Sequence, residues 1–191
     1  MPRLIQTGLW RWIKGTGLER FELLQMAHEW ILRGAIVALA EHGSAEARYE
    51  VVRDDSWHTR CADISLRDGR GERILRVAVE KGQWYENGRT ANMVTGCVDI
   101  ELEWSPSTNT IPIRRLRLAV GERSGLITAA WVRFPDLALQ SLPQEYERTS
   151  ERWYRYISGG GTFSAEIAVD DEGLALSYEG FWQRAVAKLD V

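Results

Sequence analysis

The stretch CVDIELEW, residues 97–104, decides the fold class of this chain. Four apolar residues alternate in it with three carboxylates: Val98, Ile100, Leu102 and Trp104 against Asp99, Glu101 and Glu103. A period of two places successive side chains on opposite faces of a strand and matches no face of an α-helix. The stretch therefore predicts a β-strand.

Similar patterns continue along the chain. Residues 162–178, TFSAEIAVDDEGLALSY, alternate on both sides of DDEG, which predicts a hairpin with its turn at 170–173. Turn sequences such as RDGRGE and SGGG separate other alternating segments. These segments predict further strands at 46–54, 57–66, 73–80, 126–134 and 152–158.

One segment leaves two interpretations open. Residues 18–43, LERFELLQMAHEWILRGAIVALAEHG, are rich in Leu, Ala and Glu, which favours a long helix on propensity alone. The same residues divide at a polar break, AHE, into possible strands at 19–26 and 30–41, the second containing the β-favouring GAIVAL. The residue pattern does not choose between helix and strands.

Length and patterning together predict the architecture. The 191 residues contain no linker or repeat, so we expect one domain, 1–191, with one substantial core. Strand twist accumulates in a sheet of many strands until the sheet curls. We therefore expect an all-β protein, with a large, strongly curved antiparallel sheet forming a barrel or half-barrel and few short helices.

Composition argues against several partner classes. Lys and Arg total 24 against 27 for Asp and Glu, a net charge of -3, so we expect no nucleic acid partner. No apolar run is long enough for a membrane span, and MPRLIQTGLWRWIKGTG lacks the apolar core of a signal peptide, which predicts a cytoplasmic protein. The spacing of the His and Cys residues predicts no metal site and no cofactor. The sequence does not indicate the oligomeric state.

The most unusual stretch follows the first strand: SPSTNTIPIRRL, residues 105–116. Its hydroxyl and amide side chains favour a rigid loop, and Pro112 favours an extended Ile111. If the chain continues as a strand, Arg114 shares an apolar face with Pro112, and Arg115 lies on the other face. A buried guanidinium requires a carboxylate, for which Asp99 or Glu101 is nearest in sequence, or an anionic ligand group such as a phosphate or sugar acid. Both interpretations stay open.

Two further patterns bear on chemistry. Asp99, Glu101 and Glu103 form a carboxylate row whose spacing permits acid–base work on glycosides, although a solvated face is the commoner outcome and the one we expect. In ERWYRYI, Tyr154 and Tyr156 share one face with an arginine, a mixture that suits the wall of a ligand cavity.

Several segments resemble the bacterial putative glycolipid-binding family, long carried as a domain of unknown function. The matching segments cover nearly the whole chain: GLERFEL (17–23), YEVVRDDSWHTR (49–60), GCVDIELEWSPSTNTIPIRRLRL (96–118), AWVRFPDL (130–137), QEYER (144–148) and VDDEGLALSYEGFWQR (169–184). The resemblance implies a curved antiparallel sheet similar to that of bacterial lipoprotein carriers, around an apolar cavity. It also implies strands, and no helix, at 19–41.

Two functional hypotheses follow. The first is a non-enzymatic binding or carrier protein that holds an amphiphile, a glycolipid or related acyl compound, in the cavity of the curved sheet. The alternative is an enzyme acting on a small hydrophobic or sugar-derived substrate, with Asp99 and Glu101 as acid–base groups and Arg114 or Arg115 as an anion clamp; a scaffold with a filled cavity is a third option. We expect no catalytic residue under the first hypothesis and these ligand-binding residues: Trp57, Asp99, Glu101, Arg114, Arg115, Trp131, Tyr146, Tyr154 and Tyr156.

Overall fold

The computed structural model describes residues 1–185, and these form one large open β-sheet. The described residues contain a single short α-helix, α1 (Thr110–Leu116), and three 3-10 helices, η1 (Asn92–Val94), η2 (Ser107–Asn109) and η3 (Gly159–Gly161). The strands are β1 (Arg3–Trp12), β2 (Gly17–Met26), β3 (Glu29–Ala40), β4 (Gly43–Asp54), β5 (Thr59–Asp68), β6 (Gly71–Glu80), β7 (Gln83–Glu86), β8 (Arg89–Thr90), β9 (Asp99–Leu102), β10 (Ile127–Arg133), β11 (Ala138–Ser150), β12 (Trp153–Ser158), β13 (Phe163–Val169), β14 (Ala175–Tyr178) and β15 (Trp182–Arg184).

The sheet consists of two runs of strands that meet at the first and last strands. β1 to β8 pair in sequence order as antiparallel neighbours, and so do β10 to β15. β15 then pairs with β1, with Trp12 opposite Trp182, which joins the two runs into the order β8 to β1, then β15 to β9. The expected curved all-β half-barrel is confirmed, with one exception to its antiparallel pairing: β9 runs parallel to β10.

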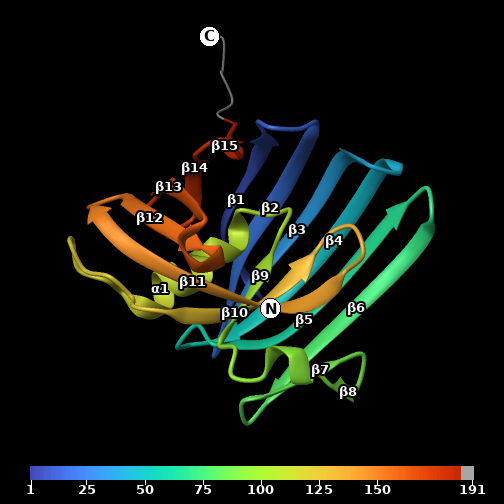
Figure 1. The fold of residues 1–191 in the computed structure, drawn as a ribbon, viewed down its shortest axis with the longest axis horizontal. Helices are drawn as coiled ribbons and strands as arrows, with labels where there is room; N and C mark the ends of the chain where they lie inside the picture. The colour runs from blue at the N-terminus through green and yellow to red at the C-terminus, as the bar shows by residue number, and fades with distance from the viewer. Residues whose placement is uncertain (186–191) are drawn as a thin grey trace.

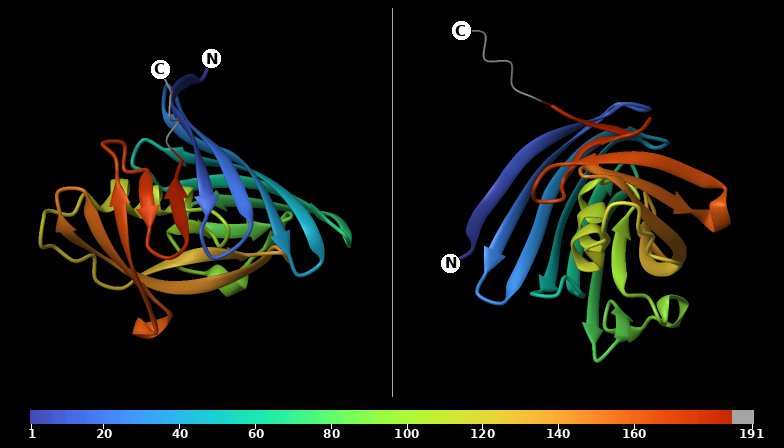
Figure 2. Two further views of the ribbon diagram at one scale, coloured as in Figure 1. Left: turned by 90° about the horizontal axis from the view of Figure 1, so that it is seen from above. Right: turned by 90° about the vertical axis from the view of Figure 1, so that its left-hand side faces the viewer.

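The parallel pair exists because the chain between β9 and β10 leaves the sheet and enters its concave side. We call residues 105–116 the inserted segment. Figure 2 shows the sheet curving around α1, and every residue from Ser105 to Ile113 is buried. Ile111 and Ile113 join one apolar core with concave-face residues such as Phe21, Leu32 and Val51. The two runs of strands therefore pack on a common centre (Figure 1).

Both ends of the sheet are protected from further pairing. At one end, β8 has only two residues. At the other, β9 is buried, and two of its backbone N–H groups donate to threonine hydroxyls: Ile100 to Thr59 of β5 at 3.2 Å and Leu102 to Thr108 of the inserted segment at 3.1 Å. Short or covered edge strands resist association with other chains.

The segment at 19–41 forms the two expected strands, β2 and β3, so the resemblance resolved the ambiguity correctly. Expected strands at 46–54, 57–66, 73–80, 126–134 and 152–158 correspond to β4, β5, β6, β10 and β12. The patterns did not identify β1 or β11. In β11, Pro143 lies opposite Thr128 of β10, and pairing with β12 begins only at the next residue, Gln144. The N–H group that proline lacks is therefore not needed for a hydrogen bond between strands.

The expected extended course of TIPIRRL is wrong, because these residues form α1. Pro112 is the third residue of the helix, and the first four N–H groups of a helix have no partner within it. The helix ends at Arg117, which adopts a left-handed conformation with φ of 51°. Arg114 and Arg115 therefore do not lie on opposite faces of a strand.

Buried hydroxyl groups attach the start of the inserted segment to the sheet. The Tyr49 hydroxyl donates to Glu19 Oε1 and lies 2.8 Å from Ser107 Oγ, while Ser105 Oγ donates to the same Glu19 oxygen at 2.7 Å. Tyr49 can reach this point because its ring lies over Gly34, where an added Cβ would approach the ring to 2.4 Å. Glu19, Tyr49 and the two serines are all buried.

The end of the inserted segment is attached by ion pairs. Arg115 donates to both carboxylate oxygens of Asp99, at 2.9 and 2.7 Å, and the Asp99 side chain is only 1% exposed. Arg114 pairs with Glu172, whose side chain is 38% exposed. The expected internal ion pair to the preceding strand exists, with Arg115 and not Arg114 as its cation.

The described residues contain neither a helix with the length and hydrophobicity to cross a bilayer nor a group of three or more His, Cys, Asp or Glu side chains arranged to hold a metal. Cys61 and Cys97 are free thiols. The cytoplasmic location stays a prediction.

The Glu19 network makes stability depend on pH. Burial raises the pKa of Glu19 to about 8, against the lowering effect of its hydrogen bonds from Tyr49 and Ser105. The folded protein thus keeps a proton that the unfolded chain releases near its ordinary pKa of 4.5, so the free energy of unfolding should fall as the pH rises from 5 to 8. Urea denaturation at several pH values measures this slope. Glu19→Gln should flatten it by up to about 1.4 kcal/mol per pH unit, whereas Glu41→Gln at an exposed site should not; an unchanged slope in Glu19→Gln contradicts the assignment.

The two arginine pairs should differ in their contribution to stability. Arg115→Met leaves the buried Asp99 carboxylate without its cation and should lower the free energy of unfolding by about 3 to 5 kcal/mol. Arg114→Met, the matched control, breaks a more exposed pair and should cost about 1 kcal/mol or less. Chemical denaturation measures both; equal losses would show that Asp99 does not depend on Arg115.

Candidate functional site

The concave face of the second run of strands retains an open hollow beside the inserted segment. We call it the aromatic pocket; its volume is about 450 Å³. Each strand from β9 to β15 contributes at least one side chain to it, because inward-facing residues recur every second position and neighbouring strands present them side by side. Its lining consists of Glu101, Glu103, Ser105, Trp131, Leu142, Tyr156, Ser158, Gly159, Phe163, Tyr178, Phe181 and Trp182.

Four of these rings contact one another in a closed circuit, which we call the aromatic quartet. The circuit runs from Tyr156 to Phe163, Phe181, Tyr178 and back, with centroid distances of 5.9, 5.4, 5.4 and 6.1 Å. The planes of successive rings meet at 64°, 66°, 51° and 76°. Steep angles of this kind are favourable between aromatic quadrupoles. The quartet therefore forms a rigid aromatic wall.

Two carboxyl groups lie in the same pocket. Burial, followed by the nearby charge of Asp99, raises the pKa of Glu101 to about 8, and Glu101 Oε2 has no hydrogen-bond partner among residues 1–185. Burial also raises the pKa of Glu103, which accepts a hydrogen bond from the Phe134 N–H at 2.7 Å. The expected solvated face for the carboxylate row is wrong, since all of β9 is buried under the inserted segment.

Glu101 is also electrostatically close to phenol groups. Burial raises the pKa of Tyr156 and of Tyr178, and the charge of Glu101 contributes to both shifts. The same holds for Tyr146, whose hydroxyl donates to Asn109 Oδ1 at 2.9 Å. The pocket thus combines an aromatic wall with one buried, unpaired carboxyl oxygen near phenols, and it can hold a partly apolar group and hydrogen-bond or charge-pair with its polar end.

The structure divides the nine predicted site residues among three places. Three of them, Glu101, Trp131 and Tyr156, line the aromatic pocket. Asp99, Arg115 and Tyr146 lie in the ion pair and hydrogen bonds that hold the inserted segment. The remaining three, Trp57, Arg114 and Tyr154, lie outside both, except that Arg114 also holds the end of the segment through its ion pair with Glu172.

Trp57 contacts two guanidinium groups. The Arg53 group lies 4.8 Å from the Trp57 ring centroid and the Arg114 group 4.5 Å from it. Arg53 is fully buried, and its three guanidinium nitrogens have no hydrogen-bond partner among the described residues; burial lowers its pKa to about 9. Arg114 and Tyr154 also line a smaller polar hollow of about 270 Å³.

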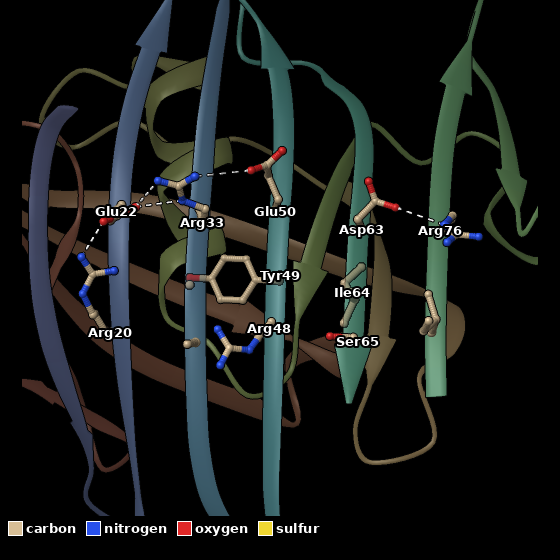
Figure 3. A pocket seen from close by; sticks show the side chains of 13 residues that line it. Arg20, Glu22, Arg33, Arg48, Tyr49, Glu50, Asp63, Ile64, Ser65 and Arg76 are labelled. Carbon is tan, nitrogen blue, oxygen red and sulfur yellow. Dashed lines mark hydrogen bonds and ion pairs between the residues drawn. The ribbon is translucent and has the colours of Figure 1, made fainter. Parts of the chain in front are cut away.

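A larger hollow on the outer face of the sheet has different chemistry. This outer groove, about 520 Å³, crosses β2 to β6 (Figure 3). Its charges neutralise one another along the strands: Glu22 pairs with Arg20 and with Arg33, each at 2.5 Å, and Asp63 lies 3.7 Å from Arg76. A surface on which charged side chains pair in this way offers little unpaired charge or apolar area to a ligand. The aromatic pocket is therefore the better candidate site.

Most of the quartet was absent from the predicted site. Phe163 and Tyr178 were recognised as members of the 162–178 hairpin, yet nothing local to that hairpin shows which face meets the pocket. Phe181 and Trp182 follow it in EGFWQR and lie in the β14–β15 turn and β15. The clustering of aromatic residues between 153 and 182 was the available signal, and only the sheet order reveals that they converge.

Comparisons with known proteins agree with this architecture. The family model described as putative glycolipid-binding matches residues 7–184. A crystal structure of a DUF1089 family protein from Pseudomonas aeruginosa superposes with a TM-score of 0.79 at 32% sequence identity, covering 87% of this chain and 92% of that chain. No curated protein matches the sequence significantly. With the match extending from β1 to the last strand of the sheet, the chain belongs to the putative glycolipid-binding family.

Proposed function

We propose that this protein is a non-enzymatic binding or carrier protein that holds an amphiphile, a glycolipid or related acyl compound, in the aromatic pocket. The observation that carries the proposal is the pocket itself: a hollow of about 450 Å³ with six aromatic side chains and a few polar groups. Ligand sites of proteins commonly measure about 300 to 1,000 Å³ and combine apolar walls with a small number of placed polar groups. Membership of the family supports a binding role.

The pocket is more polar than the apolar cavity expected from the resemblance. The inserted segment fills the concave space beneath β2 to β5, so that only the β9 to β15 side stays open. Aromatic rings and carboxyl groups, and not Leu, Ile and Val, form most of the lining. A ligand of this pocket therefore presents an apolar part to the aromatic and aliphatic lining and a polar group to Glu101.

The enzymatic alternative has one favourable observation. A carboxyl with a pKa of about 8 in a pocket, as for Glu101, is suited to act as a general acid. Its proposed partner Asp99 is bound to Arg115, and neither Arg114 nor Arg115 lines the pocket. The binding role accounts for more of the arrangement.

Filling the pocket tests the proposal. Ser158 lies in the lining, so Ser158→Phe should place a ring in the hollow and weaken binding of a dodecyl-chain amphiphile by about tenfold or more. Native mass spectrometry of the folded protein with dodecyl maltoside detects the complex directly. The matched control is Ser44→Phe at an exposed position of β4, which should bind like the unmodified protein.

Two results would contradict the proposal. One is a folded protein that binds no acyl-chain compound under any condition tried. The other is equal binding by the Ser158→Phe and Ser44→Phe variants, which would place the ligand outside the aromatic pocket.

A further inference from the structure

The aromatic pocket contains acidic residues but no basic ones. Glu101 and Glu103 belong to its lining, which includes no Lys, Arg or His. The two arginines expected to meet an anionic head group are engaged elsewhere, Arg115 by Asp99 and Arg114 by Glu172. A phosphate, sulfate or sugar-acid group in this pocket would meet two carboxyl groups and no cation among the lining residues.

The Glu101 carboxyl lacks a counter-charge in this pocket. It is buried at 7% exposure, and its Oε2 atom has no hydrogen bond within the described part of the chain. A buried carboxylate requires a counter-charge or hydrogen-bond donors, or else it stays protonated. Because Glu101 lines the pocket, a ligand that brings a positive charge to its carboxyl group would supply the counter-charge that the lining lacks.

The aromatic quartet favours the same kind of ligand. Aromatic ring faces attract cations, and enclosing rings are the usual recognition device for ammonium groups. One ring of the quartet already takes part in such a contact: the ammonium nitrogen of Lys14 lies 4.0 Å from the centroid of the Phe181 ring. The charge of Glu101 also contributes to the raised pKa of Tyr156 and of Tyr178, two members of the quartet.

We infer that the aromatic pocket selects amphiphiles whose head group carries a positively charged nitrogen, either an amine or a quaternary ammonium group. The nitrogen lies against the quartet and pairs with Glu101, while the acyl part occupies the remaining apolar wall. This inference rests on the proposed function and adds the head-group class to it. A lipid with an amino-sugar head group fits both the proposed function and the inferred head-group class.

The pairing makes affinity depend on pH. With a pKa of about 8, Glu101 of the free protein is largely protonated at neutral pH. A bound cation favours the carboxylate, so binding below pH 8 releases a proton. Affinity for a cationic ligand should therefore rise between pH 6 and pH 8 and level off above it, whereas affinity for a neutral ligand should not.

Three amphiphiles with the same dodecyl chain separate the possibilities: dodecyltrimethylammonium, dodecyl maltoside and dodecyl sulfate, each below its micelle concentration. Isothermal titration calorimetry with the full chain should give the ammonium compound an affinity about tenfold or more above the other two at pH 8.5. Glu101→Gln should remove that preference and its pH dependence while leaving maltoside binding unchanged. Glu80→Gln, at an exposed site of β6, is the matched control.

A second variant covers the possibility that Glu101→Gln disturbs folding. Phe181→Leu removes one ring of the quartet near the surface and should weaken ammonium binding several-fold more than maltoside binding. Maltoside or sulfate binding as tight as ammonium binding, or a preference that survives Glu101→Gln, overturns the head-group inference alone. If none of the three compounds binds the folded protein, the proposed function itself fails.

Discussion

The structure depends on the burial of a polar segment inside a curved sheet. Residues 105–113 enter the concave side, where water is not available to their backbone and hydroxyl groups, and each buried polar group therefore needs a partner in the protein. Ser105, Ser107, Tyr49 and Glu19 supply those partners at the start of the segment. The bidentate contact of Arg115 with Asp99 does so at its end. Together they hold the two runs of strands on one core.

The same insertion explains why the hollow lies on one side only. Ile111 and Ile113 fill the space against the first run of strands, with Phe21 and Val51 among their neighbours in the core. The aromatic pocket lies beside the start of the inserted segment, where Ser105 joins its lining, and Glu101 contributes to it from β9, the strand from which the segment departs.

Local patterns predicted most of the sheet, since alternation is a property of each strand alone. The 19–41 segment shows the limit, because its composition favours a helix and pairing with neighbouring strands overrode that preference. For TIPIRRL the error was the reverse, because an extended chain was expected and a helix formed. Its proline suggested an extended chain, and the tertiary position placed that proline where a helix tolerates it. The site was predicted in part: Glu101, Trp131 and Tyr156 meet in the pocket, while Phe163, Tyr178 and Phe181 converge on it only through the order of distant strands.

The pairing of β1 with β15 has a consequence for how the protein is made. On a ribosome, β1 emerges before the other strands of the described sheet, yet β15, the strand that covers its second edge, emerges after them. The meander from β1 to β8 can assemble early from neighbouring hairpins, but one edge of β1 stays unpaired until β15 has been made. Unpaired edges recruit strands from other chains. The nascent protein is thus most exposed to aggregation during synthesis of its second half, the interval in which a chaperone would have most to protect.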